Sequence, residues 1–174
     1  FFQPEDGIRD SWASRGLGDV YKRQSLCLEY LDENPPVNLD VIDFGCGTGI
    51  LAIAAAKLKA KSVLAIDNDP QAVIASQENV IKNHCDEVIN TIHSKDQDNS
   101  SRCDLLIANI LATPIIGLEP LFSEFLKSNG TILLSGIIKD QVEDVVNCYS
   151  KNFTDIKLAN KDEWYRISAT RKSS

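Results

Sequence analysis

The sequence of 174 residues predicts one α/β domain, a doubly wound and mostly parallel sheet with helices on both faces and a C-terminal antiparallel hairpin. Three observations support this prediction. Short strand patterns alternate with helical patterns from residue 25 onwards. Runs such as TILL at 131–134 are continuously apolar, as in a strand buried on both faces. The last two strand patterns have no crossover helix between them, which favours a hairpin.

The expected elements are bounded by turn and capping residues. The first helix has Ser25 as its candidate N-cap and ends before two prolines. Asp69 and Pro70 suit the N-cap and first position of a later helix. We expect strands at 39–44, 62–66, 87–92, 104–108, 131–135, 153–158 and 164–170, and helices at 25–31, 50–59, 70–83, 114–127 and 139–150.

Residues 1–24 do not share this pattern. They show no sustained period of 2 or 3.6, and their four acidic and four basic side chains cancel. The net charge of −7 therefore belongs to residues 25–174. The strings EDGIRD and DVYKRQ resemble translated sequencing-adapter read-through, and the alternative is a native but poorly ordered leader. In both cases we expect little stable structure there and a domain that covers 25–174.

Composition limits the partners and the compartment. An acidic chain without a Lys/Arg run is a poor candidate for direct nucleic-acid binding. No apolar stretch approaches the roughly 20 residues needed to cross a bilayer, so no membrane association is expected. The five cysteines form no C-x-x-C pair, which indicates reduced thiols in a cytoplasmic protein. His84 and His93 are too isolated to predict a metal site.

A glycine-rich turn follows the first strand, and an acidic residue ends the next one. In a doubly wound sheet, ligands bind outside the carboxyl ends of the strands. This rule predicts one cleft formed by residues 43–49, 67–69, 92–94 and 109–113.

The turn itself distinguishes among nucleoside ligands. The dinucleotide fingerprint G-x-G-x-x-G would need a glycine where Ile50 stands, so NAD is the less favoured alternative. The P-loop lysine motif is absent. The form D-x-G-x-G-x-G at 43–49 resembles the first motif of S-adenosylmethionine methyltransferases. Gly45 and Gly47 then let the backbone approach the methionine part of the cofactor, and Asp67 can accept hydrogen bonds from its ribose hydroxyls.

A more specific resemblance covers residues 25 to about 172. The matching strings are VIDFGCGTGILAIAAAKLKA, AIDNDPQAVIASQENVIKN, LLIANILATPI, LLSGIIKDQ and EWYRISA. In this order they resemble the catalytic domain of the ribosomal protein L11 methyltransferase family. The resemblance implies a Rossmann-like seven-stranded fold, S-adenosylmethionine as cofactor, and methylation of the α-amine and lysine ε-amines of a large-subunit ribosomal protein in the cytoplasm. It also implies that Gly45 and Asp67 contact the cofactor and that Asn109 matches the family's asparagine after the fourth strand.

The segment A-F-G-T-G-x-H-x-T-T, which precedes the first helix in that family, is missing here. Gln24 stands where its last threonine would be, so we expect a carboxy-terminal fragment that contains the catalytic domain. Asn109 is the candidate catalytic and cofactor-binding residue, because its side-chain oxygen can accept a hydrogen bond from the incoming amine. The alternative role for Asn109 is to cap its own loop. Two other functions stay open, an NAD-dependent oxidoreductase and a non-catalytic S-adenosylmethionine-binding module.

Overall fold

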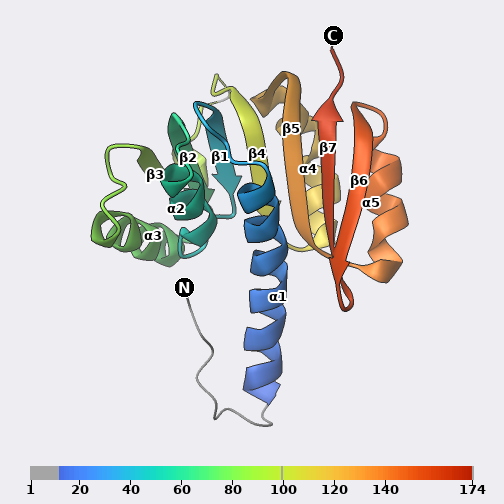
Figure 1. The fold of residues 1–174 in the computed structure, drawn as a ribbon, viewed down its shortest axis with the longest axis horizontal. Coiled ribbons are helices and arrows are strands. Elements are labelled where there is room, and N and C mark those ends of the chain that lie inside the picture. Colours follow the sequence, from blue (N-terminus) through green and yellow to red (C-terminus); the bar gives the residue numbers. More distant parts are fainter. Residues whose placement is uncertain (1–11, 99, 174) are drawn as a thin grey trace.

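Seven strands form one sheet in the order β3-β2-β1-β4-β5-β7-β6 (Figure 1). The structure, a computed structural model, describes residues 12–98 and 100–173, with side chains from residue 18 on. Strands β1 to β5 are parallel, and β7 pairs antiparallel with both β5 and β6. The expected mostly parallel sheet with a C-terminal hairpin is therefore confirmed.

The strands are β1 (Asp40–Phe44), β2 (Ser62–Asp67), β3 (Ile89–His93), β4 (Cys103–Asn109), β5 (Leu126–Ile138), β6 (Phe153–Lys161) and β7 (Trp164–Arg171). The helices are α1 (Trp12–Glu33), α2 (Ile50–Lys57), α3 (Pro70–Lys82), α4 (Ala112–Phe125) and α5 (Val142–Tyr149). Two short 3-10 turns, Ser94–Asp96 and Lys139–Gln141, follow β3 and β5. Several boundaries differ from the expected ones by a few residues, because helix and strand ends depend on packing as well as on propensity.

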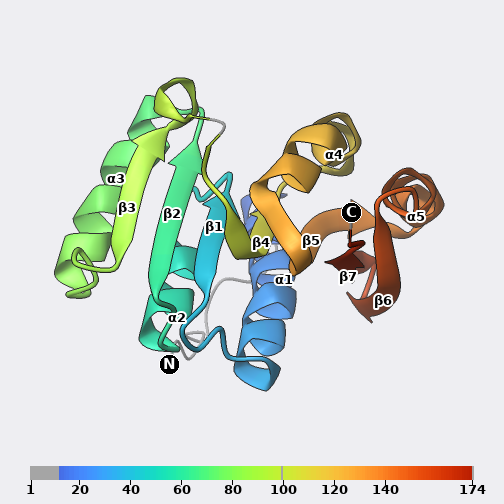
Figure 2. The ribbon, with the colours of Figure 1, turned by 90° about the horizontal axis from the view of Figure 1, so that it is seen from above.

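The sheet lies between helices on both of its faces (Figure 2). An apolar cluster fills the space between the sheet and the helices on each face. Successive side chains of a strand point to opposite faces, so neighbouring residues of β4 enter different layers. Leu105 and Ile107 pack with side chains of α1, α2 and α3, whereas Leu106 and Ala108 pack with those of α4 and α5. This explains why the parallel strands are continuously apolar in sequence.

Helix α1 begins well before the position that the sequence predicts. Ser25 lies inside the helix and donates its hydroxyl to the carbonyl of Lys22, so the expected N-cap is wrong. Residues 12–24 are helical, which differs from the expected absence of stable structure, while residues 1–11 lie outside the described part of the chain. Contacts with the β6–β7 hairpin support this end of α1: Arg23 stacks 4.9 Å from the centre of the Trp164 ring. That residues 1–24 are foreign to the domain stays a prediction.

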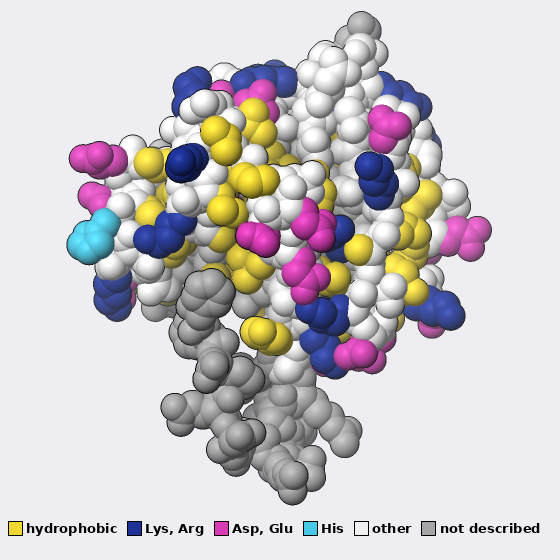
Figure 3. Space-filling model, viewed as in Figure 1, with side chains coloured by type: hydrophobic (Ala, Val, Ile, Leu, Met, Phe, Trp, Pro, Cys, Tyr) yellow, Lys and Arg dark blue, Asp and Glu magenta, His cyan; other side chains and the backbone are white. Residues whose placement is uncertain are grey.

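On the face that α1, α2 and α3 cover, acidic and basic side chains of the described residues are intermixed (Figure 3). No helix within the described ranges is both long and apolar enough to span a bilayer.

Candidate functional site

The glycine loop after β1 turns sharply and is anchored on the neighbouring strand. Gly45, Gly47 and Gly49 have φ values of 75°, 55° and 81°, in the left-handed region that glycine adopts without strain. The amides of Gly45 and Cys46 both donate to the carbonyl of Ile66, at 2.8 and 3.0 Å. The loop therefore lies across the carboxyl ends of β1 and β2. A Cβ atom added at Gly47 would meet no described atom within 4 Å, so the loop has open space beside it.

Asp67 connects this loop to the end of β2. Its Oδ2 accepts a hydrogen bond from the amide of Gly47 at 2.8 Å, and its Oδ1 accepts one from the amide of Asp69 at 3.0 Å. The residue is 9% exposed. A carboxylate has about four lone-pair sites, so Asp67 retains acceptor capacity after these two bonds.

A second carboxylate, Asp43, lies beneath the loop, and its role was not predicted from the sequence. Its Oδ2 accepts a hydrogen bond from the amide of Ala52, one of the unpaired donors in the first turn of α2. The pKa of Asp43 is raised to about 7, chiefly by burial; the hydrogen bond from Ala52 opposes the rise, and the nearby charge of Asp67 adds to it. An acidic residue next to the last position of a mostly apolar strand was the available signal.

A cavity of about 530 Å³ opens at this edge of the sheet. Phe44, Gly45, Ile66, Asp67, Asn68, Ser94, Ile110, Leu111, Pro114 and Leu118 line it, together with Arg23 of α1. The lining comes from the ends of β1 and β2, the turn after β3 and the start of α4. The four segments predicted to form one cleft do meet here. Arg23 was not predicted, because the sequence places it in the leader.

Asn109, the last residue of β4, lies next to this lining and is not part of it. It pairs in register with Ser135 of β5. Its Oδ1 is buried and has no hydrogen-bond partner among the described residues. The oxygen therefore does not cap its own loop, which was the alternative role. An unpartnered buried acceptor is costly, and such groups are concentrated where a protein receives a ligand.

Two other polar residues near the cleft, Asp69 and His93, have structural partners. Asp69 caps α3 by accepting a hydrogen bond from the amide of Gln71, as predicted. The Nδ1 atom of His93 accepts a hydrogen bond from the amide of Lys95, and its Nε2 lies 3.0 Å from the carbonyl oxygen of Asn68. No cluster of three potential metal ligands occurs in the part of the chain that the structure describes.

Known proteins of one family match most of this chain. The profile of the family described as ribosomal protein L11 methyltransferase (PrmA) matches residues 21–172. A curated relative with that name from Shewanella sp. (strain W3-18-1) is 44% identical over 165 residues, which are 95% of this chain and 56% of the relative. One from Hydrogenovibrio crunogenus (strain DSM 25203 / XCL-2) is 44% identical over 149 residues, 85% of this chain and 50% of the relative. The chain belongs to the ribosomal protein L11 methyltransferase family.

Solved structures show the same relationship. The crystal structure of ribosomal protein L11 methylase from Lactobacillus delbrueckii subsp. bulgaricus has a TM-score of 0.76 and 30% identity, covering 87% of this chain and 79% of that one. An RNA methyltransferase from Salinibacter ruber in complex with S-adenosyl-L-homocysteine has a TM-score of 0.70 at 14% identity, covering 87% and 93%, and shares the fold. The predicted family and Rossmann-like methyltransferase fold are confirmed, and the NAD alternative is not favoured. The chain spans about half the length of the curated relatives it matches.

Proposed function

We propose that this chain is the catalytic domain of an S-adenosylmethionine-dependent methyltransferase that modifies amines of ribosomal protein L11 in the cytoplasm. Family membership and the names of the relatives support this function. The single observation that carries it is the hydrogen bond from Gly47 to Asp67 beside the 530 Å³ cavity, with open space next to the loop. The acidic composition supports a protein partner rather than a nucleic acid or a membrane.

The residues present fit this cofactor. S-adenosylmethionine has no phosphate groups, and the loop carries none of the basic residues that a phosphate site would use. Asp67 would accept hydrogen bonds from the ribose hydroxyls with its remaining lone pairs. Gly45 and Gly47 would lie along the methionine part, and the apolar side chains of Phe44 and Ile110 would border the adenine or the reacting groups.

The chemistry then depends mainly on position. When bound, the cofactor supplies a methyl group on a positively charged sulfur, which is already activated for transfer. The protein contributes proximity and orientation. An acceptor lysine has an ordinary pKa near 10.4 and must lose its proton before it can react. We propose that Oδ1 of Asn109, which has no partner in the described structure, accepts a hydrogen bond from the incoming amine and directs its lone pair. Because this oxygen is buried, the side chain would turn towards the cavity as the substrate enters.

Calorimetry on the full chain tests cofactor choice. We expect S-adenosylmethionine and S-adenosylhomocysteine to bind and NAD not to bind. Binding of NAD alone would contradict the proposal and favour an oxidoreductase.

A methylation assay tests catalysis. The chain is incubated with purified ribosomal protein L11 and S-adenosylmethionine, and peptides are examined by mass spectrometry for methyl groups on the α-amine and on lysines. Asn109→Ala should lose turnover, and its loss of cofactor affinity should be smaller than its loss of turnover. Cofactor binding by the parent chain without any methyl transfer would instead favour the non-catalytic module.

A further inference from the structure

Two glycines that are far apart in the sequence pack against Ile110, the residue that follows Asn109. Gly45 lies after β1, and Gly136 lies within β5. Both have positive φ values, of 75° and 91°, and in both the space that a Cβ atom would need is occupied by Ile110. Ile110 lines the cavity that we assign to the cofactor.

Gly136 contacts the backbone of Ile110. A Cβ atom at position 136 would lie 2.1 Å from the carbonyl oxygen of Ile110 and 2.8 Å from its carbonyl carbon. Such distances are far inside van der Waals contact, so any other residue would displace the turn. Gly136 is also where the pairing of β5 with β7 shifts, between Ser135 and Ile137. A bulge of this kind redirects the strand locally.

Gly45 contacts the side chain of the same residue. A Cβ atom at position 45 would lie 2.4 Å from Cγ2 of Ile110. Gly136 therefore constrains the backbone of Ile110, and Gly45 constrains its side chain. Asn109 precedes this fixed point and is itself the last residue of β4 to pair with β5, opposite Ser135.

We propose that Gly136 is a positioning residue: by admitting the backbone of Ile110 at such a short distance, it sets the orientation of the Asn109 amide and the shape of the cavity wall. This role rests on the proposed function of Asn109. It explains why the reactive edge of the sheet contains a glycine that does not line the cavity.

Combining each glycine substitution with Ile110→Ala distinguishes the role of Gly45 from that of Gly136. Gly45→Ala should weaken S-adenosylmethionine binding at least 10-fold, and adding Ile110→Ala should restore part of it, because the conflicting Cγ2 is removed. Gly136→Ala should lower kcat for methyl transfer at least 10-fold and change the cofactor Kd less than 3-fold. Ile110→Ala should not restore kcat, because the conflict at Gly136 is with the backbone. Restoration of Gly136→Ala by Ile110→Ala, or an unchanged kcat, would overturn the proposal.

Gly117→Ala is the matched control, since a Cβ atom there meets no described atom within 4 Å. It should leave kcat and Kd within 2-fold of the parent chain. If Gly136→Ala does not fold, Ile110→Ala and Ile110→Gly form the test. Only the glycine variant frees the backbone of the turn, so it should lose at least 10-fold more kcat than the alanine variant. Equal losses in both would contradict the role of Gly136.

A spectroscopic readout does not depend on activity. The side-chain amide resonance of Asn109, identified by its absence from Asn109→Asp, should shift in Gly136→Ala and stay unchanged in Gly117→Ala. A resonance that does not move would overturn the positioning role even if the parent chain is active. Conversely, a shift in a chain that neither binds the cofactor nor methylates the substrate would support positioning and reject only the proposed function.

Discussion

The two edges of the sheet use the same residue type in different ways. At the carboxyl edge, Asp43 and Asp67 are buried and accept hydrogen bonds from backbone amides. At the amino edge, Asp40 and Asp104 are partly exposed, and both accept a hydrogen bond from Lys127, at 2.9 and 3.0 Å. Backbone amides fix a carboxylate without a neighbouring cation, which leaves lone pairs for a ligand. A lysine between two carboxylates leaves a closed ion pair, which contributes to stability.

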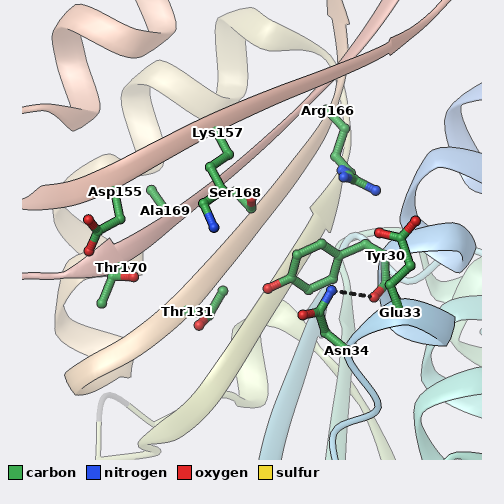
Figure 4. A pocket seen from close by; sticks show the side chains of 10 residues that line it. All are labelled: Tyr30, Glu33, Asn34, Thr131, Asp155, Lys157, Arg166, Ser168, Ala169 and Thr170. Atoms are coloured by element: carbon green, nitrogen blue, oxygen red, sulfur yellow. Dashed lines mark hydrogen bonds between the residues drawn. The ribbon is translucent and has the colours of Figure 1, made fainter.

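A second cavity differs from the first in the residues that line it. Figure 4 shows it between the C-terminal part of α1 and the face of β5, β7 and β6, with a volume of about 350 Å³. Thr131, which lines it, pairs with Leu105 towards the amino end of β4. Its charged lining balances two basic side chains, Lys157 and Arg166, against two acidic ones, and includes no glycine. Concavity alone therefore does not distinguish the two cavities; the glycine loop and the backbone-bound carboxylates do.

The pH dependence of stability should show the largest difference between the edges. The pKa of Asp43 is about 7 in the folded chain against an ordinary 3.8. A carboxyl with a raised folded pKa binds its proton more tightly when folded, so its contribution is full below about pH 4 and is lost as the pH rises to about 7. Three units correspond to roughly 4 kcal/mol in unfolding free energy. Urea unfolding between pH 4.5 and 7.5 measures this, and Asp43→Asn should flatten the fall. An equally steep fall in the variant would contradict the assignment.

The second largest expected effect is on cofactor affinity. Asp67→Asn removes the charge that would hold the ribose hydroxyls, and a hydrogen bond to a charged group contributes about 1.5–3 kcal/mol. We therefore expect roughly 10- to 100-fold weaker S-adenosylmethionine binding by calorimetry. The control is Asp69→Ser, which keeps a capping side chain at α3 and should bind normally. Equal losses of affinity in both variants would contradict the assignment of Asp67 to the cofactor and of Asp69 to the helix cap.

Lys127→Met should have a smaller effect, confined to stability. Its pairs are partly exposed, so the expected loss is about 1 kcal/mol of unfolding free energy, with cofactor affinity unchanged. The pKa of Asp40 is lowered to about 2, first by the hydrogen bond from Lys127 and then by the one from Ser62. This contribution is present above about pH 4 and is lost as the pH falls towards 2. Lys82→Met is the matched control, because its contact with Glu78 is exposed and 4.0 Å long. Weaker cofactor binding by Lys127→Met would show that the carboxyl and amino edges of the sheet are energetically coupled.

The smallest effect belongs to the second cavity. Lys157 lines this cavity and is exposed. Lys157→Ala should change neither cofactor affinity nor methyl transfer by more than about 2-fold, because salt screens the charge of an exposed side chain. Titration calorimetry and the methylation assay measure both quantities. A larger change would mean that the second cavity takes part in function.

Much of the site could be predicted because it depends on local pattern. Gly45, Gly47 and Asp67 follow strands that their apolar runs reveal, and parallel strands bring their carboxyl ends to one edge. The capping role of Asp69 needs only its own backbone and the next two residues. The buried role of Asp43 was harder to predict, because its partner is nine residues away and its pKa depends on burial.

The sequence by itself determined the order of strands and helices, the glycine loop, the acidic end of β2 and the family. The tertiary structure decided the length of α1, the unpartnered oxygen of Asn109 and the approach of Gly136 to Ile110. The reason is the range of the forces involved. Turns, caps and apolar periodicity depend on a few neighbouring residues, whereas burial, steric exclusion and an unsatisfied acceptor exist only once distant segments have packed together.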